Sequence, residues 1–202
     1  MVLITGSVGL FGASALAGYG TASRLDYVLV PPLFGLGTAV VTLVGVAIGA
    51  GDRARARRVA WTGALLAFAA TETIGLLVAF APNLWLGIFS HDPAVLSTGA
   101  LYLHRIGPIY GATGLSMLLY FAGQGSGRVA APFLAGTVRL LFVTGTGWLA
   151  VNHFGAGLPT LFTIVAAGAV LSAMITAIAV GGPLGLRLSV PAASTGDPET
   201  ES

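Results

Sequence analysis

Charged side chains are almost absent from five long stretches of the chain, and this pattern predicts membrane-spanning helices. Residues 27–50, 106–127 and 154–180 contain no charged residue, whereas residues 59–81 and 129–151 contain one each, Glu72 and Arg139. A helix needs about 20 apolar residues to cross the hydrocarbon core of a bilayer, which is about 30 Å thick. We therefore expect five transmembrane helices, at residues 24–50, 58–81, 102–124, 129–151 and 158–181.

The two ends of the chain differ from these stretches. Residues 1–11 are apolar from the first position and lack the positive charge that begins a signal peptide. Because eleven helical residues reach only about 16 Å, we interpret them as a partial sixth helix, within which the chain begins, followed by a turn at residues 12–20. Residues 183–202 are polar and contain proline and serine, so we expect a disordered tail after one helical domain at residues 1–182.

The composition supports an all-α integral membrane protein. Hydrophobic residues make up 55% of the 202 positions and charged residues only 8%, whereas a soluble domain carries about 25% charged residues. The chain has no cysteine, which excludes disulfides, thiolate nucleophiles and thiolate metal sites. Its 30 glycines favour close helix packing, because small residues let helix backbones approach one another in lipid.

The arginines predict the orientation of the helices. If the loop with the densest positive charge is cytoplasmic, alternating spans place Arg128 and Arg187 on the same side. Arg24 and Arg105 then fall at the outer ends of their spans, in agreement with the positive-inside rule. Nucleic-acid binding would require a basic face on a soluble fold, so we interpret the cluster as a topology signal. The cluster consists of Arg53, Arg55, Arg57 and Arg58.

Four segments resemble the C-terminal half of the MATE family, the multidrug and toxic compound extrusion transporters. In order they read ASRLDYVLVP, GLGTAVVTLVGVAIGAGDRARARRVAW, LWLGIFSHDPAVL and ALYLHRIGPIYGATGLSMLLYFAGQGSGRVAAP. Their order and spacing also match, so that the resemblance covers about residues 1–182. One departure is the pair Val46 and Ala47, where family members often carry polar residues.

The resemblance implies one bundle of a fold in which two six-helix bundles enclose a substrate cleft. The expected function is secondary active export of organic cations or drugs in exchange for H⁺, or Na⁺, by a fragment of the full transporter. Its partners would be a small organic cation, the coupling ion, the lipid bilayer, and a missing N-terminal bundle or a second copy. We expect a multi-pass protein of the plasma (inner) membrane with a cytoplasmic C-terminus. No cofactor, metal or nucleic acid is expected.

Two charged residues lie near the middle of their predicted spans. Glu72 is about 21 Å from Arg58 and about 15 Å from Pro82 along a helix. Ionisable groups are costly in lipid and are functional candidates by default. Glu72 would exchange a proton for a cationic substrate, or it would be a tolerated neutral group, or it would pair structurally with Arg139; these readings stay open.

Asp26 lies on the first full span, before the pair Pro31-Pro32. The prolines should kink the helix and free carbonyl groups near a cavity. The resemblance places an acid here in many family members, within an Arg-x-acid pattern. Arg24 and Asp26 are two residues apart and should not face each other on a helix. Asp26 is therefore expected either to line the cleft or to cap an interface.

Aromatic and histidine side chains give further candidates. Tyr110 and Tyr120 are ten residues apart, which places them within about 80° on one helix, and a drug cleft would use them for cation–π contact. Tyr102, near a helix end, is interpreted as an interfacial anchor. Arg105 is expected to extend to the outer interface, and His104 beside it is a weak candidate for a pH sensor.

Three other functions are alternatives to cation export. A lipid-linked flippase of the same superfamily would need a large basic cleft. An intramembrane enzyme would need a nucleophile–base pair or metal ligands, but the three histidines are scattered and no HExxH or GxSxG motif occurs; we expect no enzyme. A non-transporting structural half remains the fourth possibility.

Overall fold

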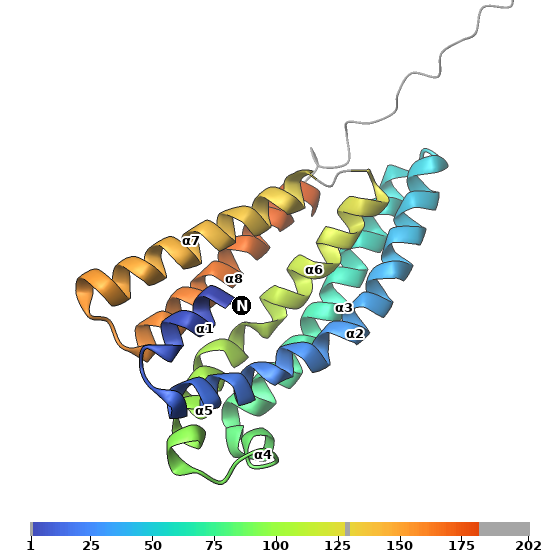
Figure 1. Ribbon diagram of the computed structural model, residues 1–202. Coiled ribbons are helices and arrows are strands. Elements are labelled where there is room, and N and C mark those ends of the chain that lie inside the picture. Colours follow the sequence, from blue (N-terminus) through green and yellow to red (C-terminus); the bar gives the residue numbers. More distant parts are fainter. Residues whose placement is uncertain (1, 128–129, 182–202) are drawn as a thin grey trace, which may run out of the picture.

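The computed structural model describes residues 2–127 and 130–181, and the described part of the chain is helical without strands (Figure 1). Arg128 and Arg187, and the predicted tail at residues 183–202, lie outside the described residues. The elements are α1 (Val2–Gly9), α2 (Ala13–Gly49), α3 (Arg53–Phe80), α4 (Pro82–Leu86), α5 (Pro93–Ile106), η1 (Gly107–Ile109), α6 (Tyr110–Gly125), α7 (Ala130–Phe154) and α8 (Leu158–Gly181).

Helix α2 begins earlier than the sequence pattern predicted. The expected turn at residues 12–20 is wrong, because only residues 10–12 turn the chain and Gly12 adopts a positive φ of 104°. The next residues are helical because their small side chains pack closely: a Cβ on Gly18 would lie 2.6 Å from the carbonyl oxygen of Val95 in α5. Pro31 and Pro32 lie inside α2, and the helix changes direction along its length (Figure 1).

Helices α3 and α6 are held together by small residues. The buried face of α3 repeats every three or four positions, as expected for one face of a helix. A Cβ on Gly114 of α6 would lie 2.8 Å from the carbonyl oxygen of Ala67, so the two backbones are almost in contact. The buried residues of α3 are Ala56, Ala60, Ala64, Ala67, Thr71, Gly75 and Ala79.

The start of α3 corrects the predicted arginine loop. The arginine cluster, Arg53 to Arg58, occupies the first turns of the helix rather than a loop, and the helix begins at residue 53 instead of 58. Asp52 is the N-cap, with its side chain accepting a hydrogen bond of 2.9 Å from the backbone N–H of Arg55. All four arginines are exposed.

The predicted span at residues 102–124 is not one continuous α-helix. The structure divides this region into α5, the 3-10 turn η1 and α6. Pro108 lies in η1 and has no backbone N–H to donate to a continuous helix.

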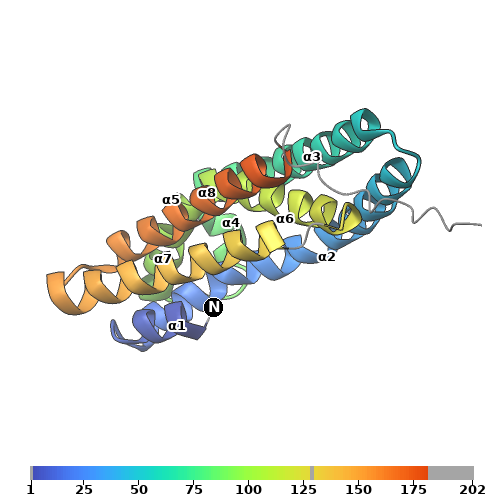
Figure 2. The same cartoon turned by 90° about the horizontal axis from the view of Figure 1, so that it is seen from above.

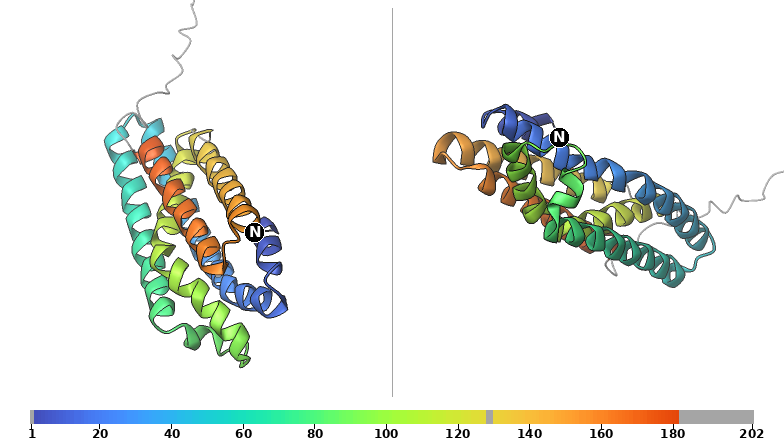
Figure 3. Two further views of the ribbon diagram at one scale, coloured as in Figure 1. Left: turned by 90° about the vertical axis from the view of Figure 1, so that its left-hand side faces the viewer. Right: turned by 90° about the horizontal axis from the view of Figure 1, so that it is seen from below.

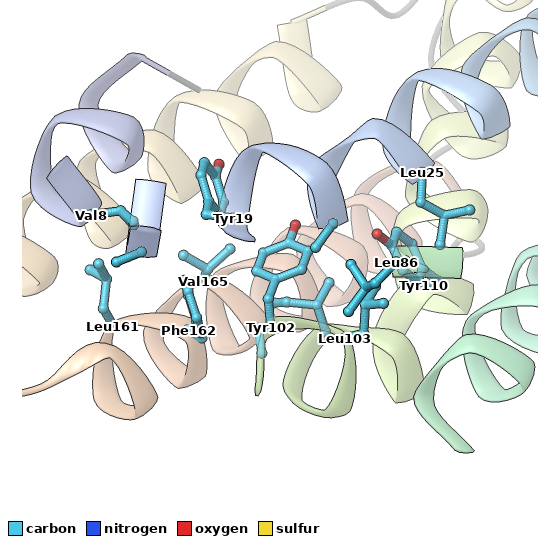
Figure 4. Close-up of a cluster of buried hydrophobic side chains, with 14 of the residues drawn as sticks. Val8, Tyr19, Leu25, Leu86, Tyr102, Leu103, Tyr110, Leu161, Phe162 and Val165 are labelled. Atoms are coloured by element: carbon cyan, nitrogen blue, oxygen red, sulfur yellow. The ribbon is translucent and has the colours of Figure 1, made fainter. Parts of the chain in front are cut away.

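Two buried clusters form the core. One gathers side chains from α1, α2, α4, α5, α6, α7 and α8, including Val8, Tyr19, Leu86, Tyr102 and Phe162 (Figure 4). The other joins α2, α3, α6 and α8. Helices α7 and α8 run side by side with α1 next to α7, as Figures 1 and 2 show, and Figure 3 shows the bundle from two further sides.

Four of the described helices are long and apolar enough to cross a membrane. They extend over Ala13–Gly49, Arg53–Phe80, Phe133–Val151 and Leu158–Val180. Many large apolar side chains point outward, among them Phe80 at 85% and Leu84 at 78% exposure. In water such a surface would be unfavourable, whereas lipid solvates it.

Candidate functional site

A cavity of about 210 Å³ lies inside the bundle, and Asp26 is the acidic residue on its wall. The cavity is bounded by residues of α2, α3, α5, α6, α7 and α8 and by Ile109 of η1. Asp26 is half-buried. The polar and aromatic residues on the wall include Asp26, Thr71, Tyr102, Thr113, Tyr110 and Arg139. Asp26 therefore lines a cavity of the bundle, and its expected role in a substrate cleft stays a prediction.

Tyr102 donates a hydrogen bond to Asp26, with 3.4 Å between the hydroxyl oxygen and Oδ2. Its ring is only 4% exposed. It packs edge-on against Tyr19 and Phe162, at centroid distances of 5.3 Å and 5.2 Å. The interpretation of Tyr102 as an interfacial anchor is wrong, because the first turns of α2 and helix α8 cover it on the inside of the bundle.

Tyr110 occupies the neighbouring part of the cavity wall. The residue is 3% exposed, and its buried hydroxyl lies near the side chains of Asp26 and Tyr102 without a hydrogen bond of good geometry to either. Figure 4 shows Tyr102 and Tyr110 next to the ribbon of α2. A buried hydroxyl without a partner is unfavourable, so this group is available to a ligand or to the carboxyl group of Asp26.

Arg139 lies where three cavities meet. It borders the cavity of Asp26 and two others of about 560 Å³ and 530 Å³. Asp26 and Arg139 lie on the walls of two of these cavities together, whereas Glu72 lies on neither wall. A structural pair of Arg139 with Glu72 stays a prediction, and the shared cavity walls make Asp26 the alternative partner.

Tyr120 belongs to the 560 Å³ cavity rather than to that of Asp26. The two cavities share Thr113, Met117 and Arg139 on their walls. Tyr110 and Tyr120 thus line neighbouring but different cavities.

Glu72 is half-buried and accepts a hydrogen bond from the backbone N–H of Gly111, with 2.8 Å from the nitrogen to Oε2. It is not on the wall of the Asp26 cavity. The sequence offered no signal for this contact, which joins residues 39 positions apart.

The remaining polar candidates lie away from the cavity. Arg24 is exposed and stacks over Phe89, 5.0 Å from the ring centroid, which confirms that Arg24 and Asp26 point apart. Arg105 donates a hydrogen bond of 2.8 Å to the hydroxyl of Thr163. His104 is exposed, and the described residues contain no group of three side chains suited to bind a metal.

Comparison with known proteins places this geometry in a family. The MatE family model matches residues 1–149. The multidrug resistance protein NorM of Burkholderia vietnamiensis is 32% identical over 186 residues, which cover 88% of this chain and 40% of that protein. The probable multidrug resistance protein NorM of Thermotoga maritima is 26% identical over 123 residues, 61% of this chain and 26% of that protein.

The chain therefore spans less than half the length of these curated relatives. The family match covers most of the described helices, and four of them are long and apolar enough to cross a membrane. The chain is a multi-pass membrane protein of helical bundle architecture, and it belongs to the MatE family.

Proposed function

We propose that the chain is one bundle, the C-terminal one, of a multidrug exporter, and that Asp26 exchanges a proton for an organic cation. The observation that carries the proposal is a half-buried carboxyl group on the wall of a mainly apolar cavity inside a membrane bundle. The NorM relatives are named for multidrug resistance, and an organic cation is a substrate class that such a cavity suits.

The exchange follows from the energetics of a carboxylate in this environment. An isolated charge in a medium of low dielectric is costly, so the empty site favours a protonated carboxyl group or one whose charge is balanced. The hydroxyl of Tyr102 donates to it, and Arg139 provides a positive charge on the same wall. A bound cation stabilises the ionised form, and the carboxyl proton then leaves to water. Reprotonation releases the cation.

The aromatic wall suits an organic rather than an inorganic cation. The ring faces of tyrosine attract positive charge, and the wall also contains aliphatic side chains such as Leu29, Leu33 and Val165. A delocalised cation gains apolar contact at the same time as it meets the carboxylate. Na⁺ is the alternative coupling ion, and the experiment below distinguishes the two.

A complete cleft requires more than these helices. Because the chain spans 40% of its Burkholderia relative, the other wall comes from a second bundle or a second copy of this chain. The exposed Arg53–Arg58 cluster at the start of α3 marks the cytoplasmic side of the inner membrane under the positive-inside rule. If α5, η1 and α6 together cross the membrane once, alternation of the spans gives a cytoplasmic C-terminus.

The test uses the complete transporter in proteoliposomes, with tetraphenylphosphonium as the substrate cation. An imposed pH gradient should drive transport by the wild type, and Asp26→Asn should reduce the rate by at least about 100-fold, because an essential proton site is removed. Asp52→Asn is the matched control: it removes an exposed acid at the N-cap of α3, where asparagine caps equally well.

Transport by Asp26→Asn at the wild-type rate would reject the assignment. Transport that follows a Na⁺ gradient and not a pH gradient, in the wild type, would reject the proton as the coupling ion.

A further inference from the structure

The joint between α5 and α6 interrupts the regular α-helical hydrogen bonds, and the N–H of Tyr110 donates to the carbonyl oxygen of Gly107 in the 3-10 turn. Residues Gly107–Ile109 form a 3-10 turn, and α6 starts at Tyr110. The residue before α6, Ile109, offers no side-chain cap. The first N–H groups of a helix have no partner within it, and inside an apolar bundle such donors need an acceptor from elsewhere.

Glu72 of α3 provides that acceptor. Its Oε2 lies 2.8 Å from the backbone nitrogen of Gly111, the second residue of α6. A carboxylate at this place has two favourable interactions, a charge-assisted hydrogen bond and attraction to the positive end of the helix dipole. Glu72 thus acts as an N-cap that comes from a different helix.

The surrounding contacts leave the joint little freedom. A Cβ on Gly75 would overlap the carbonyl oxygen of Gly107 and lie 2.9 Å from the Cβ of Tyr110. A Cβ on Gly111 would lie 2.7 Å from Oε2 of Glu72 itself. The carboxylate and the glycine contacts therefore hold the first turn of α6 against α3.

Tyr110 is the residue that this arrangement fixes in space. It precedes Gly111 directly, its ring lines the cavity of Asp26, and its hydroxyl is buried without a partner. Any rotation of the first turn of α6 would move this hydroxyl relative to the carboxyl group of Asp26. Glu72 does not reach the cavity, so it influences the site only through the backbone of α6.

We propose that Glu72 is a positioning residue: it caps α6 at Gly111 and thereby holds Tyr110 in place to contact the substrate in the Asp26 cavity. This inference rests on the proposed function for its effect on transport, but the cap itself does not. It replaces the hypothesis that Glu72 carries the coupled proton, because a cap needs an oxygen acceptor and not an ionisable group.

Two substitutions in the complete transporter separate a cap from a proton carrier. Glu72→Gln keeps an acceptor oxygen and loses the ionisable group, whereas Glu72→Leu loses both. For Glu72→Leu we expect the KM for tetraphenylphosphonium to rise about tenfold. For Glu72→Gln we expect KM within about threefold of the wild type, and the same dependence of rate on pH.

A double-mutant cycle with Tyr110→Phe tests the route of the effect. The change in log KM caused by Glu72→Leu is measured in the wild type and again in the Tyr110→Phe background. If Glu72 acts through the hydroxyl of Tyr110, the change in the Tyr110→Phe background should be less than half of the change in the wild type. Independent effects that simply multiply would overturn the positioning role. A pH dependence lost in Glu72→Gln, as in Asp26→Asn, would overturn it in favour of a proton carrier.

Hydrogen exchange tests the cap without transport. In the detergent-solubilised complete protein, amides of the first turn of α6 should exchange about tenfold faster in Glu72→Leu but not in Glu72→Gln. Unchanged exchange in Glu72→Leu would overturn the inference while leaving Asp26 unaffected. Conversely, normal transport by Asp26→Asn together with faster exchange in Glu72→Leu would reject the proposed function and keep the cap. If Glu72→Leu does not fold, the comparison is made with Glu72→Met.

Discussion

Substitution of Gly75 by alanine tests the closest approach between α3 and the start of α6. The added Cβ would overlap the carbonyl oxygen of Gly107 and lie 2.9 Å from Tyr110 Cβ and 3.0 Å from Tyr110 Cδ2. The carbonyl oxygen of Gly107 belongs to the backbone and cannot move aside by a change of rotamer, so the helices themselves must separate. Overpacking of this kind costs about 1–3 kcal/mol, and because backbone must move we expect a value near the upper end, about 3 kcal/mol.

Gly35→Ala in α2 is the matched control. A Cβ there meets no atom within 4 Å, and alanine is favoured over glycine within a helix by about 0.5–1 kcal/mol. We therefore expect Gly35→Ala to be neutral or slightly stabilising. Both variants carry the same chemical change, so that their difference isolates the contact with η1.

The assay is unfolding of the purified complete transporter, followed by circular dichroism as sodium dodecyl sulfate is added to mixed micelles. Gly75→Ala should unfold at a clearly lower mole fraction of dodecyl sulfate than the wild type, and Gly35→Ala should not. Equal midpoints for Gly75→Ala and Gly35→Ala would refute the reasoning, because α3 and η1 would then not be in contact as described.

Two further substitutions have defined outcomes. Asp52→Ala removes the N-cap of α3, which accepts from Arg55 at 2.9 Å, and should lower the free energy of unfolding by about 0.5–2 kcal/mol; Asp52→Asn should restore it in the same dodecyl sulfate titration. Tyr102→Phe removes the donor to Asp26 at 3.4 Å and, because this hydrogen bond is long, should raise the KM for tetraphenylphosphonium by less than about tenfold. A larger loss of transport in Tyr102→Phe than in Asp26→Asn would contradict the assignment of Asp26 as the central group.

The long helices were predictable because their length and lack of charge are set by the bilayer. The predicted starts of the second, fourth and fifth spans, at residues 58, 129 and 158, lie within five residues of α3, α7 and α8. The interruption at Gly107–Ile109 was missed although Pro108 stands in the sequence. A proline in an apolar run is tolerated in membrane helices when neighbouring groups satisfy the freed backbone, so the residue alone did not decide between a kink and a break.

Part of the candidate site was also predictable. Asp26 and Arg139 were candidates because charged side chains are costly within membrane spans, and Tyr110 because an aromatic ring attracts cations; the structure brings all three to one cavity. Tyr102 was misplaced because its partner is Asp26, 76 positions away. Its position close to the end of a predicted span favoured an interfacial role until packing was known.

The role of Glu72 was the least accessible to sequence reasoning. Its depth in the membrane suggested coupling or a charge pair, whereas its hydrogen-bond partner is a backbone N–H at the interruption between α5 and α6. Every residue except proline has a backbone N–H, so the residue type at position 111 does not reveal that this N–H needs an acceptor. It needs one only because the helix is interrupted there. Both facts depend on tertiary structure.

Proton release on substrate binding tests the central claim most directly. Tetraphenylphosphonium is added to the purified complete transporter in weakly buffered detergent solution, and a pH indicator reports the protons released. Near the pH at which transport is fastest, the account predicts release approaching one proton per bound cation from the wild type and none from Asp26→Asn. Equal release from the two proteins would show that the exchanged proton comes from another group and would contradict the account.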